Sequence, residues 1–144
     1  KYALVLNQDM LVDEATQRFA EQPASRSIFL VDDENTLVGV VNPHDILNWV
    51  RLQLNLAQDD MRLSLATVRR TLHASRVRDL AMPGSSDMSV NLNDTLQDVV
   101  LRMSRYDLVD IPVLDEQGRL VGDISLRDIL AHIVLNETCP IDTV

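Results

Sequence analysis

The sequence predicts an α+β fold made of two βαββα units that pack sheet to sheet with pseudo-two-fold symmetry. Three observations lead to this prediction: a gap-free internal repeat, a strand–acidic turn–strand pattern in each copy, and amphipathic helical segments on either side. A unit of roughly 50 residues buries too little apolar surface to be stable alone, so the two units are expected to pair.

The internal repeat aligns residues 28–39 with residues 111–122. Each copy has an apolar run, an acidic turn and a second apolar run that ends in glycine, at Gly39 and Gly122. Acidic, Asn and Gly residues between two β-rich runs indicate a tight turn, because they tolerate positive φ angles. Each copy therefore contains one predicted hairpin.

A helix is predicted on each side of each hairpin. Before the hairpins, apolar residues recur at the i, i+3, i+4, i+7 spacing of a helix with one buried face. Asp9 and Asn93 are the N-cap candidates for these helices. After the hairpins, Asp-Ile-Leu at residues 45–47 and 128–130 opens a helix in both copies. The apolar residues of the first pair of helices are Val12, Ala15, Thr16 and Phe19, matched by Leu96, Val99, Val100 and Met103.

The chain divides into a first repeat at residues 1–54, a helical connection at 55–76 and a second repeat at 77–144. The apolar run Lys1–Leu6 begins as a strand without an initiator Met, so we expect a fragment of a larger host protein. Apolar residues keep helical spacing through the long connection. It can be an ordinary amphipathic helix that packs on its own domain, or a coiled-coil or host-contacting arm.

Composition excludes several classes of partner. The net charge of −9 opposes binding to nucleic acid or to an anionic membrane. The chain has no apolar run long enough to cross a bilayer and only one cysteine, Cys139. We therefore expect a cytoplasmic protein, or the cytosolic part of a membrane protein, without direct membrane insertion.

The repeat resembles the cystathionine-β-synthase (CBS) domain, and the whole chain resembles a tandem CBS pair, or Bateman module. The resemblance is carried by Ile-Pro-Val-Leu-Asp at residues 111–115, by Gly-Arg-Leu-Val-Gly at residues 118–122 and by Ser125-x-x-Asp128. Val77-Arg78-Asp79-Leu80-Ala81-Met82 leads into the second copy. Membership would imply a regulatory module with two related clefts, often a homodimer, that commonly binds an adenine-containing ligand such as AMP, ADP or ATP.

The resemblance also implies which residues contact such a ligand. In nucleotide-binding members, the Asp of Ser/Thr-x-x-Asp accepts hydrogen bonds from the ribose, and the Ser or Thr and the helix N-terminus meet phosphate. The expected ligand-binding residues are Ser125, Asp128, Ile124, Arg127, Ile111 and Pro112 in the second copy, and Asp45, Asn42, His44 and Arg26 in the first.

Both copies depart from the family pattern. Asn42 stands where Ser or Thr is usual, and the second copy has Asp110 before its hairpin and Asp123 directly after Gly122, where an apolar residue is customary. Acidic side chains oppose phosphate binding. We therefore expect at most one well-formed nucleotide site per pair.

Other interpretations stay open. Ser125-x-x-Asp128 is also an ordinary helix cap, and Arg26, His44 and Arg127 can be solvated surface residues. The acidic clusters 32–34, 59–60 and 115–116 could attract divalent cations, although two of them are predicted turns.

Neither zinc-ligand spacing nor a catalytic motif is present, so we expect neither a metal site nor an enzyme. The leading prediction is a regulatory ligand sensor linked covalently to a host domain. The alternative is a ligand-free dimerisation or autoinhibitory module of a transporter, channel or enzyme.

Overall fold

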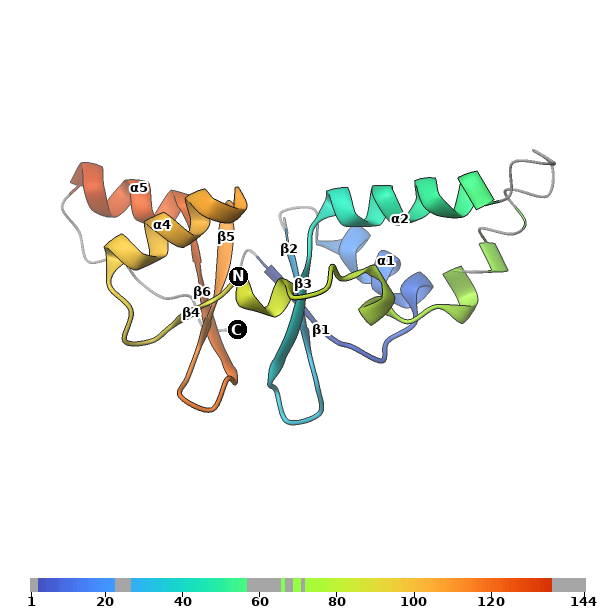
Figure 1. Cartoon of the computed structure of the whole chain (residues 1–144), viewed down its shortest axis with the longest axis horizontal. Coiled ribbons are helices and arrows are strands. Elements are labelled where there is room, and N and C mark those ends of the chain that lie inside the picture. Colours follow the sequence, from blue (N-terminus) through green and yellow to red (C-terminus); the bar gives the residue numbers. More distant parts are fainter. Residues whose placement is uncertain (1–2, 23–26, 57–65, 67–68, 71, 136–144) are drawn as a thin grey trace.

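A computed structural model describes residues 3–22, 27–56, 66, 69–70 and 72–135. The described residues form two three-stranded sheets, with strand orders β1-β2-β3 and β4-β5-β6. Figure 1 shows the two sheets side by side at the middle of the molecule, with α1 and α2 beside the first sheet and α4 and α5 beside the second. The predicted α+β class and the predicted pair of repeats are confirmed.

The first repeat contains β1 (Ala3–Asn7), α1 (Val12–Glu21), β2 (Ser27–Val31), β3 (Leu37–Val41) and α2 (Pro43–Leu56). β1 pairs with β2 in parallel, and β2 pairs with β3 in the predicted hairpin. Val12 and Ala15 of α1 are buried, and Phe19 packs against them from the same face. Three of the four residues predicted for the buried face share one side of the helix, whereas the fourth, Thr16, is exposed.

The second repeat contains β4 (Val90–Asn91), α4 (Leu96–Tyr106), β5 (Asp110–Leu114), β6 (Leu120–Ser125) and α5 (Leu126–Leu135). Its sheet repeats the first topology, with β4 parallel to β5 and β5 antiparallel to β6. Val99 and Met103 of α4 are buried in a separate core with Ile111 and Val113. Each repeat therefore has a hydrophobic core of its own.

Two short 3-10 helices, η1 (Val77–Leu80) and η2 (Ser85–Asp87), precede the second sheet. The Val77 N–H donates to the Met10 carbonyl at 2.8 Å, and Val77 and Leu80 are buried in the core of the first repeat. The segment expected to lead into the second copy thus packs against the first. Most of the predicted helical connection, at residues 57–65, 67–68 and 71, lies outside the described residues.

The N-caps of the first helices differ from the prediction. Leu11 is the N-cap of α1, whereas Asp9 accepts a hydrogen bond from the Arg78 guanidinium. Thr95 is the N-cap of α4, where it forms a reciprocal capping box with Asp98. Asp9 and Asn93 were each two residues too early, because a turn still separates them from the helix.

The hairpin turns confirm the predicted chemistry. The carboxylate of Asp32 accepts hydrogen bonds from the Glu34 and Thr36 N–H groups, each at 2.9 Å. Asp115 accepts equivalent bonds from Gln117 and Arg119. The residue with positive φ is Asn35 in the first turn (65°) and Gly118 in the second (81°). These residue types adopt such angles at the lowest cost.

The two sheets meet through a third apolar cluster. Phe29, Val31, Leu37 and Val40 of the first sheet are buried together with Leu120 of the second, and Leu114 packs against them. Burying a side chain of this size contributes about 1.5–3 kcal/mol. The predicted sheet-to-sheet packing therefore supplies a core that neither repeat has alone.

The hairpin tips are also hydrogen-bonded to each other. The Leu37 N–H donates to the Gly118 carbonyl at 3.1 Å, and the Leu120 N–H donates to the Asn35 carbonyl at 2.9 Å. The Asn35 side chain adds a bond to the Leu120 carbonyl at 2.8 Å. The tips form a backbone connection between segments 85 residues apart.

Candidate ligand-binding sites

The start of α5 carries the Ser125-x-x-Asp128 element. The Ser125 N–H donates to Oδ2 of Asp128, and the Asp128 N–H donates to Oγ of Ser125, both at 3.1 Å. This reciprocal pair is a helix cap, because it satisfies two backbone donors that the helix leaves open. The cap occupies one carboxylate oxygen of Asp128, and no described residue donates to the other.

The start of α2 has the corresponding arrangement with one change. The Asn42 N–H donates to Oδ2 of Asp45 at 2.9 Å, as in the second copy. The Asn42 side chain does not return a cap, because its Oδ1 accepts a hydrogen bond from the Ser27 hydroxyl at 3.2 Å. Asp45 and Asp128 therefore have the same structural role, whereas Asn42 and Ser125 differ.

Strand alternation decides which predicted residues lie between the sheets. Successive residues of a strand point to opposite faces. Ile111 and Ile124 belong to the core of the second repeat, whereas Pro112 lies on the face that also carries Leu114 and meets the first sheet. The structure places Pro112 and Ser125 on the face between the sheets, with Asp128 hydrogen-bonded to Ser125, and places Ile111 and Ile124 on the other face.

The remaining predicted contacts are basic or exposed. Arg127 and His44 are exposed near the starts of α5 and α2. Arg26 lies outside the described residues.

The face between the sheets carries different side chains in the two copies. In the second copy Asp110 pairs with Ser125 across the β5–β6 ladder, and Asp123 pairs with Pro112. The corresponding residues of the first copy are Ser27 and Val40. We refer to Ser27, Val40, Asn42 and Asp45 as the first site, and to Asp110, Asp123, Ser125 and Asp128 as the second site.

The second site contains two fully buried acidic side chains. Asp110 is 1% exposed and Asp123 is 0% exposed. Burial is the largest cause and the neighbouring Asp123 the next, and together they raise the pKa of Asp110 to about 8. The predicted unfavourable environment for phosphate is therefore concentrated in two buried carboxyl groups beside Ser125 and Asp128.

Ser27 was not among the residues predicted to bind a ligand. Its hydroxyl contacts Asn42, the residue that replaces the usual Ser or Thr. The sequence could have indicated Ser27 as a site residue, because extending the internal alignment by one residue upstream pairs Ser27 with Asp110.

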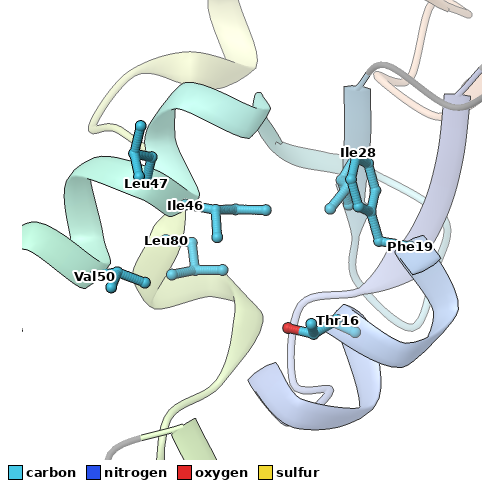
Figure 2. Close-up of a pocket in the computed structure, with 8 residues that line it drawn as sticks. Thr16, Phe19, Ile28, Ile46, Leu47, Val50 and Leu80 are labelled. Carbon is cyan, nitrogen blue, oxygen red and sulfur yellow. The ribbon is translucent and has the colours of Figure 1, made fainter. Parts of the chain in front are cut away.

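A pocket of about 280 Å³ lies elsewhere, on the helical side of the first repeat. Figure 2 shows Thr16 and Phe19 of α1, Ile46, Leu47 and Val50 of α2, and Leu80 of η1 around it. Its lining is almost entirely apolar, with Thr16 the one residue that has a polar side chain. The pocket therefore lacks the groups that recognise a ribose or a phosphate.

The acidic turns do not form metal sites in the part of the chain that the structure describes. Within those residues, no group of three or more His, Cys, Asp or Glu side chains is arranged to hold a metal ion. Asp32 and Asp115 instead close their own hairpin turns. The described helices are also too short or too polar to span a bilayer.

Several solved structures share this fold. CBSX2 in complex with AMP superposes with a TM-score of 0.67 at 23% identity, covering 92% of this chain and 89% of that one. A CBS domain pair/ACT domain protein of Thermotoga maritima gives 0.65 at 22% identity, covering 94% and 91%. The cytosolic domain of the Mg²⁺ channel MgtE in complex with ATP gives 0.63 at 22%, covering 90% of this chain and 44% of that one.

Sequence comparison points to the same family. Cystathionine beta-synthase of Dictyostelium discoideum is 26% identical over 72 residues, which are 50% of this chain and 14% of that protein. The family model for the CBS domain matches residues 1–52 and 64–135. With two matched stretches, two βαββα repeats and a shared fold, this chain belongs to the CBS domain family and forms a CBS domain pair.

Proposed function

We propose that this CBS pair is a non-catalytic regulatory module of a larger cytoplasmic or membrane-anchored host, and that it binds an adenine-containing ligand at the second site. The observation that carries the proposal is the Ser125–Asp128 pair at the start of α5. It presents the second carboxylate oxygen of Asp128 at the N-terminal end of a helix, where the helix dipole favours an electronegative group.

The chemistry of these groups suits a nucleoside. A carboxylate accepts hydrogen bonds from the two hydroxyls of a ribose, and helix-start N–H groups favour an electronegative group next to it. The similar structures of CBSX2 and MgtE, in complex with AMP and ATP, support the choice of ligand class. The first site is the weaker candidate, since the Asn42 side chain is engaged by Ser27.

The competing proposal is a ligand-free module for dimerisation or autoinhibition. It is favoured by the acidic residues of the second site and by the exposed apolar side chains on α2 and α5, which include Leu47 (65% exposed) and Leu130 (51% exposed). Exposed apolar side chains on a helix are typical of protein contacts where they gather into one patch.

Thermal unfolding with AMP, ADP, ATP, adenosine and S-adenosylmethionine separates the two proposals. A ligand that binds only the folded state raises the melting temperature by mass action. We expect at least one of these compounds to raise it at millimolar concentration. If none of them does, the chain is not an adenine-ligand sensor, and the dimerisation module remains.

The variant Asp128→Ala tests the site itself, with Asp98→Ala as matched control. Each variant removes the acidic member of a capping box, so each should cost about 1 kcal/mol of stability. Asp128→Ala should also weaken the ligand by roughly 10-fold or more, as expected for a lost hydrogen bond to a charged group. Equal ligand-induced shifts in both variants would mean that Asp128 is only a cap.

A further inference from the structure

A second pocket, of about 330 Å³, lies along α4 and shares no residue with the first or second site. The described residues that line it are Asp98, Leu101, Arg102 and Arg105. Their i, i+3, i+4, i+7 spacing brings the four side chains to one face of the helix. The pocket therefore presents two guanidinium groups, one carboxylate and one apolar side chain.

Arg102 is the anchored member of the two arginines. Its Nη1 donates a hydrogen bond to the Ser89 carbonyl at 3.0 Å, and the residue is half-buried. Asp98 lies one turn earlier on the same face. Hydrogen bonds from Thr95 hold the pKa of Asp98 below its ordinary value, and the charge of Arg102 lowers it further. Asp98 is therefore ionised and offsets one positive charge of the pocket.

Arg105 supplies the charge that is not offset. It is exposed, and no described residue forms a hydrogen bond or an ion pair with it. Other arginines of the described chain are paired, Arg78 with Asp9 and Arg119 with Asp115. In a chain with 22 acidic and 13 basic residues, this pocket is a local exception that favours an anion.

The first repeat does not have this combination of residues. The internal alignment pairs the four pocket residues, in order, with four residues of α1: Glu14, Gln17, Arg18 and Glu21. Glu21 has the opposite charge to Arg105, and Gln17 is polar where Leu101 is apolar. Because α1 forms without an apolar residue and an arginine at these positions, the fold of the repeat does not require Leu101 or Arg105.

The chemistry of the pocket selects one class of anion. A guanidinium group donates two parallel N–H bonds to a carboxylate. The single positive charge that remains after Asp98 is counted matches a monoanion, and Leu101 offers contact to a hydrocarbon group. We propose that this pocket binds a small organic carboxylate, with its anionic group at Arg102 and Arg105 and its apolar part against Leu101. The inference does not rest on the adenine-ligand proposal.

The test uses four probes: hexanoate, hexanamide, acetate and inorganic phosphate. Hexanamide has the shape of hexanoate without its charge, and acetate has the charge without most of the hydrocarbon. Each probe is titrated at low salt and pH 7 into the isotopically labelled chain, and backbone amide shifts in NMR spectra report both affinity and location. We expect hexanoate to shift the amides of α4 and to bind roughly 5-fold or more tightly than hexanamide and acetate.

The double variant Leu101→Gln, Arg105→Glu gives the pocket the residues of the first repeat, and should abolish the response of α4 to hexanoate. The single variant Arg105→Gln should weaken hexanoate by roughly 5-fold or more. Arg18→Gln, which removes the same charge from an exposed position on α1, is the matched control and should leave the affinity unchanged. Circular dichroism and thermal unfolding establish that the variants are folded.

Several outcomes would overturn the inference. Equal affinities for hexanoate and hexanamide would mean that the carboxylate is not recognised. Displacement of hexanoate by an equal concentration of phosphate would mean that the pocket responds to negative charge alone. If hexanoate does not shift the α4 amides, Arg105 only complements the helix dipole in the last turn of α4. None of these results bears on the adenine-ligand proposal, because the two sites have no residue in common.

Discussion

Asp45 and Asp128 accept a hydrogen bond from the backbone N–H three residues earlier, at the start of α2 and α5. The cap fixes the carboxylate in one orientation without using both of its oxygens. A side chain held in this way loses little further conformational entropy when a ligand binds. The structural role and the proposed ligand role of these aspartates are therefore compatible.

The buried Asp110 predicts an unusual dependence of stability on pH. Its pKa is about 8 in the folded chain and near 3.8 in the unfolded chain, so folding favours the protonated form. The free energy of unfolding should fall as the pH rises from about 4 to about 8, because the unfolded chain then releases a proton that the folded chain keeps. Above about pH 8 the free energy of unfolding has lost the whole contribution of the shifted Asp110 pKa.

Asp110→Asn tests this dependence. The variant cannot ionise, so its stability relative to the unmodified chain should increase between pH 5 and pH 9, by on the order of a few kcal/mol. Urea unfolding at several pH values measures the difference, and the exposed-turn variant Glu116→Gln is the control. A difference that is the same at every pH would contradict the assignment.

Single residues were predicted with mixed success from the sequence. The turn residues Asp32 and Asp115 have local roles that short-range patterns reveal, and both were placed correctly. Ile111 was grouped with Pro112 as a ligand contact, although consecutive strand residues face opposite ways and only Pro112 lies between the sheets. The unusual Asp110 and Asp123 were recognised, but their complete burial depends on packing that the sequence does not show.

Exposed apolar side chains recur at the same position of the repeat on α2 and α5. Leu47 and Leu130 are equivalent in the internal alignment, and Leu126 and Ile133 extend the exposed stripe along α5 at helical spacing. A surface of this kind on both repeats suits contact with a second copy of the chain, since a two-fold contact uses the same surface on both partners.

Leu130→Lys should weaken such a dimer. A charge at the centre of an apolar contact has to be buried without a partner, so we expect the dissociation constant to rise at least 10-fold. Light scattering after gel filtration measures the mass over a range of concentrations. Leu92→Lys, at an exposed apolar residue outside the helices, is the control. A monomeric unmodified chain, or an unchanged mass for Leu130→Lys, would contradict a dimer contact through this stripe.

The elements themselves were largely predictable. Periodicity located α1 and α4, and the acidic turns located both hairpins. The helix starts were misplaced, because Asp9 and Asn93 are good caps by residue type but lie in the turn before the helix. Leu11, the actual N-cap of α1, has no capping side chain, so no residue-type rule would have selected it.

At the scale of the whole molecule, the two repeats are connected at their hairpin tips by two backbone hydrogen bonds and by the Asn35 side chain. The internal repeat predicted that the sheets pair. It did not predict this contact, which joins residues far apart in the chain and depends on the angle between the sheets.

Asn35→Ala should destabilise the pair by about 1–2 kcal/mol, because it removes a cross-repeat hydrogen bond and puts a less tolerant residue at positive φ. Chemical denaturation measures the loss. Glu34→Ala, at the neighbouring exposed turn position, should change stability by less than about 0.5 kcal/mol. Equal losses for both variants would show that the tip contact contributes nothing.

The hydrogen bonds between the hairpin tips also hold the two sheets together at one end. The first and second sites lie toward the opposite ends of the hairpins, up to about 17 Å away for a five-residue strand. A change of about 1 Å in the spacing there would turn one sheet against the other by about 3° over that strand length. α2 and α5 begin at those ends, so such a turn would move both helices. If a ligand at one site changes the angle between the sheets, it changes the affinity at the other site by a factor that is equal in both directions.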